Sequence, residues 1–448
     1  MKLETLKKRF EEDGVRRVKI GGFDIDGVLR GKYVSLEKFL SAAEKGLGFC
    51  DVVFGWDIGD ILYDNVKLTG WHTGYPDLHA TVDLSTYRLI PWEPETAAFL
   101  LRLHPEVGPR SVLERVEKKA EAMGFRVLTG AEFEFFLFKE TPDTLAAGGI
   151  ASPQPMDPGM FGYSWLRSSQ ASALMHDLLD GCEAFDVPME GLHTETGPGV
   201  YEAAMKARTL VAAADHAALF KTAVKEIASR HGVTASFMAK WSLAYPGCSG
   251  HLHQSLWDAA GKKNLFHDPD DPRGMSKLFR HYLAGQQRLL PELTACIAPT
   301  VNSYKRFVEG TWAPLNATWG IENRTCALRV ITGPGKNATR VEVRATGADI
   351  NPYVAYAATV GAGLYGIEQG LEPTEPVTGN AYEAKGAKAR PLPRSLKDAV
   401  SALKRSRAAR EILGEDFVDH YVRTREWEVR AFEGAVTDWE LKRYFELV

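Results

Sequence analysis

The 448-residue chain lacks any apolar stretch approaching the roughly 20 residues that a membrane-spanning helix needs. Residues 1–14 are charged rather than apolar, which predicts that there is no secretory signal. The five cysteines are scattered, and none forms a Cys-x-x-Cys pair, so neither a disulfide framework nor a cysteine-based zinc site is expected. Together these absences predict a protein of the reducing cytoplasm with no membrane partner.

The chain also lacks a strong charge of either sign. Its 54 Lys and Arg against 58 Asp and Glu leave a net charge of −4, which does not favour a nucleic-acid partner. A hydrophobic content of 45% and a charged content of 25% exclude collagen, coiled-coil and disordered classes. The sequence contains neither a Gly-x-x-x-x-Gly-Lys-[Ser/Thr] loop nor a Gly-x-Gly-x-x-Gly that opens a helix. Any nucleotide would therefore be held by a different fold.

The local pattern changes near residue 105, where we place a domain boundary. Residues 1–105 read as short strands separated by turns, and the Pro-rich stretch 91–94 lies close to their end. Residues 106–448 alternate helical patterns with short strands rich in Glu, His and Arg. This combination predicts an α+β protein in which helices pack on one face of an antiparallel sheet.

Helix ends are marked by local signals. Ser111 and Glu114 form a Ser-x-x-Glu pattern, and Asn351 precedes Pro352, so both places predict a helix start. The predicted helices cover 111–123, 169–186, 209–231, a segment from 351 onward and the last fifty residues. The predicted N-terminal strands cover 17–20, 27–34 and 80–84, and 376–394 is expected to be a loop.

Three further predicted strands carry rows of polar side chains on one face, because alternate residues of a strand point the same way. The rows are Glu132 and Glu134 in 130–138, His251, His253 and Ser255 in 251–255, and Arg340, Glu342 and Arg344 in 340–344. Taken singly, the Glu row fits a solvated face, the Arg-Glu-Arg row a surface ion-pair ladder, and the His pair a satisfied structural pair. Taken together, with apolar residues on the opposite faces, the rows are expected to face one cavity.

Glu190, Glu195 and Glu202 lie around the turn 197–199 and add further carboxylates. Four or five Glu in one cavity would repel each other unless cations neutralised them. Oxygen ligands with an occasional imidazole suit Mg²⁺ or Mn²⁺. Basic residues are also concentrated: Lys305, Arg306, Arg324, Arg329, Arg340 and Arg344. A basic surface would explain them, but metals with arginines and no covalent nucleophile favour phosphoryl transfer.

These motifs resemble those of the glutamine synthetase superfamily, and in particular its glutamate–amine ligase branch. Five stretches match in order and spacing over about 440 residues. They are 130–136, 190–202, 249–255, 302–306 continuing to 324, and 340–344 continuing to 353.

The resemblance implies a fold, an assembly and a site. The fold would combine a small N-terminal β-grasp domain, 1–105, with a large catalytic domain, 106–448, that has a curved antiparallel sheet backed by helices. The assembly would be a dodecamer of two hexameric rings, with each active site between neighbouring subunits. The site would use ATP as co-substrate and two or three Mg²⁺ or Mn²⁺.

The resemblance also assigns roles to individual residues. One metal would be held by Glu134, Glu195 and Glu202, and the other by Glu132, His251 and Glu342. ATP would contact Glu190, His253, Ser255, Arg324 and Arg340. Glutamate would be held by Gly247, Arg306 and Arg344. Arg324 and Arg329 would act on the transferring phosphoryl group.

Two departures from the family pattern concern the amine. Family members that use ammonia carry a Glu in the loop before Ala313-Pro314, where this chain has Trp312. Trp312 cannot accept a proton, but it can contact an alkyl group or a cation. The segment 54–60 replaces the usual ammonium-binding Asp segment, and Asp57 is its expected equivalent, with Trp56 beside it.

The leading hypothesis is ATP-dependent ligation of L-glutamate to a small, methylamine-like primary amine through γ-glutamyl phosphate. The products would be a γ-glutamylamide, ADP and phosphate, with Asp57 and Trp312 acting on the amine. The alternative is a glutamine synthetase that uses ammonia. A third hypothesis is a catalytically inactive structural or regulatory homologue.

Overall fold

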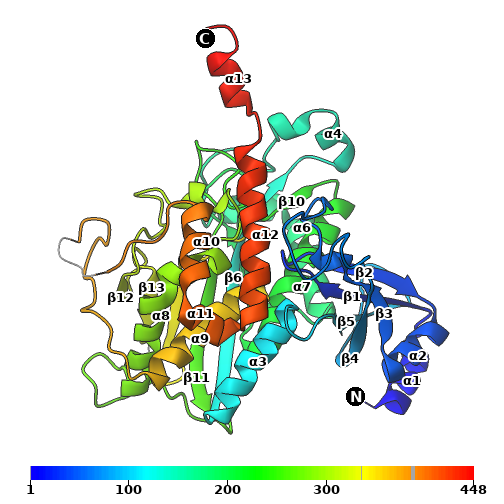
Figure 1. Ribbon diagram of the computed structural model, residues 1–448, viewed down its shortest axis with the longest axis horizontal. Helices are drawn as coiled ribbons and strands as arrows, with labels where there is room; N and C mark the ends of the chain where they lie inside the picture. The colour runs from blue at the N-terminus through cyan, green and yellow to red at the C-terminus, as the bar shows by residue number, and fades with distance from the viewer. Residues whose placement is uncertain (1, 334, 385–388) are drawn as a thin grey trace.

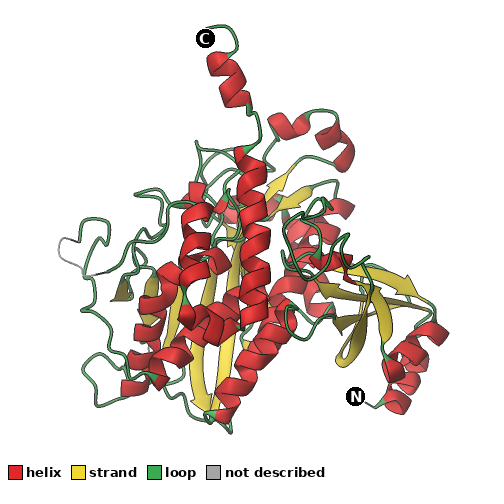
Figure 2. Ribbon diagram, in the orientation of Figure 1, coloured by secondary structure: helices red, strands yellow, loops and turns green. Residues whose placement is uncertain are grey.

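Two β-sheets organise the molecule (Figures 1 and 2). The structure is a computed structural model that describes residues 2–333, 335–384 and 389–448. Within these ranges no helix is long and apolar enough to cross a bilayer. The fold is α+β, as the sequence predicts, and its larger sheet is curled.

The N-terminal sheet has five strands in the order β2-β1-β5-β4-β3. β1 and β5 are parallel, and the other neighbours are antiparallel. The strands are β1 (Arg17–Phe23), β2 (Leu29–Val34), β3 (Leu47–Cys50), β4 (Asp77–Leu89) and β5 (Thr96–Arg102). Helices α1 (Leu3–Glu12) and α2 (Leu36–Lys45) pack on one face, where Val18, Ile20 and Phe99 lie in a small core of their own. This is the β-grasp arrangement, and the opposite face turns toward helix α7.

The larger sheet has nine strands, seven of them in the order β12-β13-β14-β11-β6-β8-β7, with β9 and β10 also paired to β6. The strands are β6 (Phe125–Phe138), β7 (Met189–Thr194), β8 (Val200–Met205), β9 (Arg208–Thr209), β10 (Thr234–Ser236), β11 (Gly250–Asp258), β12 (Trp319–Ile321), β13 (Leu328–Ile331) and β14 (Arg340–Val343). All pairs are antiparallel except β12 with β13. The larger sheet is therefore antiparallel, as expected, except at the single pair β12–β13.

Helices cover one face of the larger sheet in two layers (Figure 1). The inner layer is α3 (Pro109–Ala122), α7 (Leu210–Arg230), α8 (Lys277–Ile297) and α9 (Pro352–Glu368). Outside it lie α10 (Leu396–Arg405), α11 (Arg407–Leu413) and α12 (Glu415–Glu433), while α13 (Asp438–Tyr444) projects from the body. The remaining helices are α4 (Pro142–Ala146), α5 (Trp165–Gln170), α6 (Ser172–Ala184), η1 (Asp51–Phe54), η2 (Gly149–Ala151) and η3 (Ser303–Arg306).

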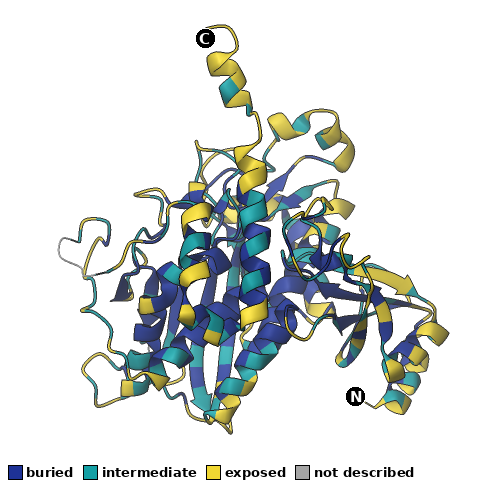
Figure 3. Ribbon diagram, viewed as in Figure 1, coloured by how far each residue is buried: buried dark blue, intermediate teal, exposed yellow. Residues whose placement is uncertain are grey.

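Strand alternation separates the two faces of this sheet. Phe133 and Phe135 are fully buried beneath the helices, and Figure 3 shows the same burial along the sheet. Gln254 faces the same way, because its amide exchanges hydrogen bonds with Tyr282 of α8 and Thr359 of α9. The neighbours of these residues along the strands therefore point to the opposite face, which the helices leave uncovered.

Most predicted elements are present, but some bounds differ. The helix predicted at 111–123 begins at Pro109, so Ser111 lies inside it and forms no capping box. The segment 169–186 contains the end of α5 and the whole of α6. Asn351 does cap α9, since its side chain accepts the backbone N–H of Tyr353.

The remaining predictions also have a structural counterpart. The helix predicted at 209–231 is α7, and the last fifty residues are helical. The strand predicted at 27–34 begins at residue 29. The described part of the loop 376–394 has no helix or regular strand, and residues 385–388 lie outside the described residues. The division of the chain near residue 105 remains our proposal.

Candidate active site

The uncovered face of the larger sheet carries a patch of carboxylates, imidazoles and guanidinium groups. Direct cross-strand pairs bring them together: Glu132 with His251, His253 with Glu342, Arg329 with Glu342, and Glu134 with Glu202. The predicted polar rows therefore lie side by side on neighbouring strands β8, β6, β11, β14 and β13.

Glu132 lies between two imidazoles. One of its oxygens is 3.1 Å from His253 Nε2, and the other is 3.7 Å from His251 Nδ1. Burial favours the protonated carboxyl, but hydrogen bonding and charge from the two histidines outweigh it and hold the pKa of Glu132 well below its usual range. Glu132 is therefore ionised at neutral pH.

Glu342 is the most buried carboxylate of the patch, with only 1% of its side chain exposed. It accepts hydrogen bonds from Arg329, at 3.0 Å, and from Arg344, and it lies 3.5 Å from His251. Burial would raise its pKa, but His251, His253 and Arg344 lower it to about 2.

The pKa values of Glu134 and Glu202 are raised, in contrast to those of Glu132 and Glu342. Burial raises the pKa of Glu134 to about 7, even though the Ser249 N–H donates to the carboxylate at 2.6 Å. Burial, followed by the charges of Glu134 and Glu132, raises the pKa of Glu202 to about 9. Glu195 and Glu342 also act on Glu202, so all five carboxylates share one electrostatic environment.

The donor set fits divalent cations. Two groups place one ligand atom per residue within 4.8 Å of one another: Glu132, His253 and Glu342, and Glu132, Glu202 and His251. Within the described chain, the buried Nε2 atom of His193 has no hydrogen-bond partner. Carboxylate oxygens with a few imidazoles suit Mg²⁺ or Mn²⁺, which would supply the missing positive charge.

Two arginines, Arg306 and Arg344, form one side of the patch. Arg306 is 2% exposed, and its Nη2 donates to the Arg344 carbonyl at 3.2 Å. Burial lowers the pKa of Arg306, and Glu134 is the first of the charges that oppose this effect. A Cβ at Gly247 would lie 2.9 Å from the Arg306 side chain and 2.4 Å from the Ala239 carbonyl. Only glycine fits there, and its backbone lies against Arg306.

The other predicted residues lie around this centre. Arg340 Nε donates to His253 Nδ1 at 3.1 Å, and Ser255 Oγ accepts from Trp257 at 3.0 Å. Arg324 is exposed, and its carbonyl accepts from Arg344. Glu190 is exposed at an irregularity between β7 and β8.

The two predicted amine-site residues lie on loops outside the patch. Asp57 accepts the backbone N–H groups of Gly59 and Ile61, both at 2.9 Å, and so closes its own turn. Trp312 is 64% exposed and adopts a positive φ of 60°. Neither makes a recorded hydrogen bond or ion pair to the metal-ligand candidates within the described residues.

Sequence reasoning missed three residues at the edge of the patch. His193 Nε2 is 3.5 Å from Glu202 and 3.7 Å from Glu195, and the His193 beside Glu195 holds the pKa of that carboxyl below its usual range. The Tyr163 ring stacks on His193 at 4.4 Å, and Glu322 binds Arg329 at 2.6 Å. The spacing of His193 two residues before Glu195 on one strand face could have identified it.

Comparisons with known proteins agree with this geometry. A family model described as glutamine synthetase, catalytic domain, matches residues 106–444. A type-1 glutamine synthetase of Dictyostelium discoideum is 52% identical over 440 residues, which is 96% of this chain and 84% of the relative. A glutamate–isopropylamine ligase of Pseudomonas sp. is 39% identical over 456 residues, 100% of this chain and 99% of the relative.

A solved structure of a GmaS–ADP complex superposes with a TM-score of 0.85 at 28% identity, covering 98% of this chain and 99% of the other. The fold and the site define an ATP-dependent ligase that forms a carbon–nitrogen bond. The chain belongs to the glutamine synthetase family.

Proposed function

We propose that this protein ligates L-glutamate to a small primary amine, with ATP as the source of energy. The observation that carries the proposal is the gathering of five glutamates, two histidines and a buried arginine pair on one uncovered sheet face. ATP would phosphorylate the glutamate γ-carboxylate, and the amine would then displace phosphate from γ-glutamyl phosphate. The products are a γ-glutamylamide, ADP and phosphate.

Charged residues of this chain would bind different parts of the substrates. Arg306 and Arg344 would bind the carboxylates of glutamate, since guanidinium groups match carboxylates with paired hydrogen bonds. Arg324 and Arg329 would stabilise the transferring phosphoryl group. Mg²⁺ held by the five glutamates and His251 would neutralise phosphate charge.

The amine preference rests on Trp312. This exposed residue occupies the position at which ammonia-using relatives have a glutamate, so that position offers an apolar face and no base. Burying one methyl group of an alkylamine contributes about 0.8 kcal/mol, which ammonia cannot gain. Asp57 is the proposed base. A relative named for ethanolamide formation, from Streptomyces coelicolor, is 36% identical and supports an amine larger than ammonia.

A second candidate is ammonia-dependent glutamine synthesis. It is favoured by the 52% identical Dictyostelium relative, whose name is that of a glutamine synthetase. An inactive homologue is disfavoured, because five closely spaced carboxylates are costly to keep in a fold that does not use them.

The deciding experiment measures phosphate release by the full-length protein with ATP, Mg²⁺ and glutamate. The amines are methylamine, ethylamine, isopropylamine, ethanolamine and ammonia, each over a concentration series. We expect a small alkylamine to give the highest kcat/KM. An ammonia kcat/KM above that of every amine would overturn the amine preference, and no turnover with any of them would overturn ligation. A dodecamer in the cytoplasm remains a prediction, and sedimentation would test the assembly.

A further inference from the structure

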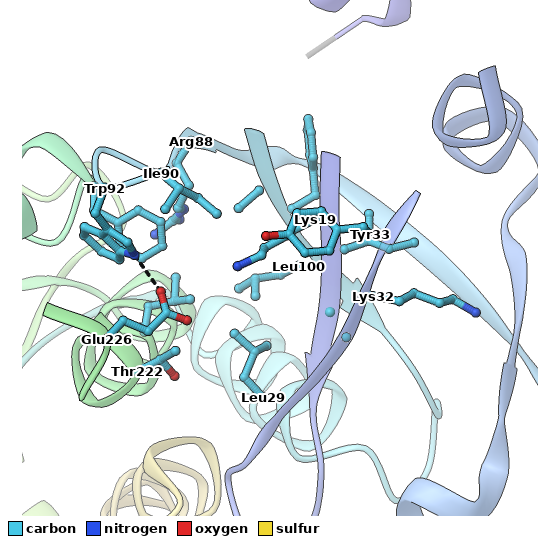
Figure 4. Close-up of a pocket in the computed structure, with 17 residues that line it drawn as sticks. Lys19, Leu29, Lys32, Tyr33, Arg88, Ile90, Trp92, Leu100, Thr222 and Glu226 are labelled. Carbon is cyan, nitrogen blue, oxygen red and sulfur yellow. Dashed lines mark hydrogen bonds between the residues drawn. The ribbon is translucent and has the colours of Figure 1, made fainter. Parts of the chain in front are cut away.

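A cavity lies between the N-terminal sheet and helix α7, and none of the candidate active-site residues lines it (Figure 4). Its volume of about 250 Å³ equals roughly eight liquid waters. That is less than the usual volume of a drug-sized pocket, so a molecule of amino-acid size is the natural occupant.

The cavity exists because the sheet carries almost no side-chain bulk at this place. Lys19 pairs with Tyr33 and with Ala98, and two residues further along Gly21 pairs directly with Gly31. Alternate residues share a face, so these residues all point toward α7. The two glycines and the alanine keep the floor low, with the Leu29 side chain beside Gly21, while Lys19 and Tyr33 form one rim.

The walls are apolar and come from both parts of the chain. Ile90 and Leu100 belong to the N-terminal region, and Phe185 and Leu219 belong to α6 and α7 or their ends. All four are at most 5% exposed. Such a surface would bury an aliphatic side chain at about 25 cal/mol per Å² of apolar area removed from water.

Two charged residues at the cavity keep unused hydrogen-bonding capacity. Arg88, the cross-strand partner of Ala98, is only 7% exposed, and its Nε donates to the Thr86 carbonyl. Its Nη1 has no hydrogen-bond partner within the described residues. Opposite it, Glu226 of α7 uses Oε2 to accept from Trp92 at 2.6 Å, which leaves Oε1 available.

Lys19 differs from these two, because it already forms an ion pair with Glu93. Figure 4 shows Lys19 reaching from the sheet toward the gap, with Trp92 and Glu226 on the opposite side. Arg88 and Glu226 therefore give the cavity a cationic and an anionic group with hydrogen-bonding atoms to spare. A ligand with a single charge would leave one of them unsatisfied, and that costs free energy in a partly buried site.

We propose that this cavity binds a zwitterionic α-amino acid with an aliphatic side chain. The carboxylate would bind Arg88, the ammonium would bind Glu226, and the side chain would lie over Gly21 and Gly31. Because the walls come from the N-terminal sheet and from α7, the bound amino acid would hold these two parts together. The site does not depend on the identity of the amine substrate.

The test is calorimetric titration of L-leucine into the full-length protein with saturating glutamate, which blocks the proposed glutamate site. Isocaproate and isoamylamine serve as probes that lack the ammonium and the carboxylate, respectively. We expect L-leucine to bind and each probe to bind at least tenfold more weakly, a difference of about 1.4 kcal/mol. Equal binding of either probe would overturn the zwitterion assignment, and no L-leucine binding would overturn the site.

Substitutions at the cavity test whether L-leucine binds there. Glu226→Gln removes the anionic group and should weaken the binding of L-leucine at least tenfold. Ala98→Leu should fill the floor of the cavity and abolish binding. Glu183→Gln is the matched control, because this exposed carboxylate of α6 does not line the cavity. Glu183→Gln should bind like the wild type. Unchanged binding in Glu226→Gln, with its fold verified by circular dichroism, would place the amino acid elsewhere.

Discussion

Binding of Mg²⁺ should release protons, because Glu202 and a fraction of Glu134 are protonated without it. The pKa of Glu202 is raised to about 9 and that of Glu134 to about 7, so at pH 7.5 Glu202 is mostly protonated and Glu134 only in part. Ligands of Mg²⁺ must be ionised, so saturation should release about one proton per chain. At pH 9.5, above both pKa values, the release should fall to a small fraction of a proton.

The assay is calorimetric titration of Mg²⁺ in buffers of different ionisation enthalpy, where the slope of apparent enthalpy gives the number of protons released. Glu202→Gln should reduce the release at pH 7.5 to well under half of the wild-type value, because only the partly protonated Glu134 remains. Apparent affinity should also rise roughly tenfold per pH unit between pH 7 and 9, since one proton is displaced. Release near zero at pH 7.5, or release unchanged in Glu202→Gln, would refute the reasoning.

Three other substitutions test the rest of the site. Glu342→Ala should destabilise the fold by about 3 kcal/mol in urea unfolding, because the usual pKa of 4.5 is lowered to about 2 and the buried Arg344 loses its carboxylate partner. The stabilisation by Glu342 is present above pH 4.5 and is lost as the pH falls toward 2. As a control, Glu322→Ala removes an exposed carboxylate and should lower the free energy of unfolding by less than about 1 kcal/mol. Arg306→Lys should raise the KM for glutamate about tenfold or more with the KM for ATP unchanged, and equal effects on both would contradict its role. Trp312→Glu should change the free energy of unfolding by less than about 0.5 kcal/mol and shift the ratio of kcat/KM values toward ammonia. An unchanged ratio would contradict a role for Trp312 at the amine site.

The gathering of carboxylates, imidazoles and arginines on one sheet face could be predicted from the sequence because these residues lie on strands. A period of two fixes which side chains share a face, and the apolar partners Phe133 and Phe135 fix which face is covered. The strand register then brings these side chains together, because Glu132 directly faces His251 and Glu134 directly faces Glu202. Alternation could not reveal the parallel pairs, because strand order depends on contacts between distant segments.

The roles of residues on loops are harder to predict from the sequence. Asp57 was predicted to be an amine base, yet its carboxylate also closes a turn by accepting two backbone N–H groups. No periodicity distinguishes a carboxylate that holds its own loop from one that meets a substrate. Asp57→Asn separates the two roles, because the amide oxygen keeps the turn while the charge is lost.

The contrast between the two halves explains how one scaffold could serve different amines. The carboxylate patch is held by backbone pairing across five strands, so altering one ligand disturbs its neighbours, as the many partners of Glu342 show. Trp312 instead lies on a loop and is 64% exposed, so its side chain can change at little cost to the fold. Selection for a new amine would therefore act on that loop first. Relatives that differ in amine should then differ in their loop side chains while keeping the glutamates of the sheet.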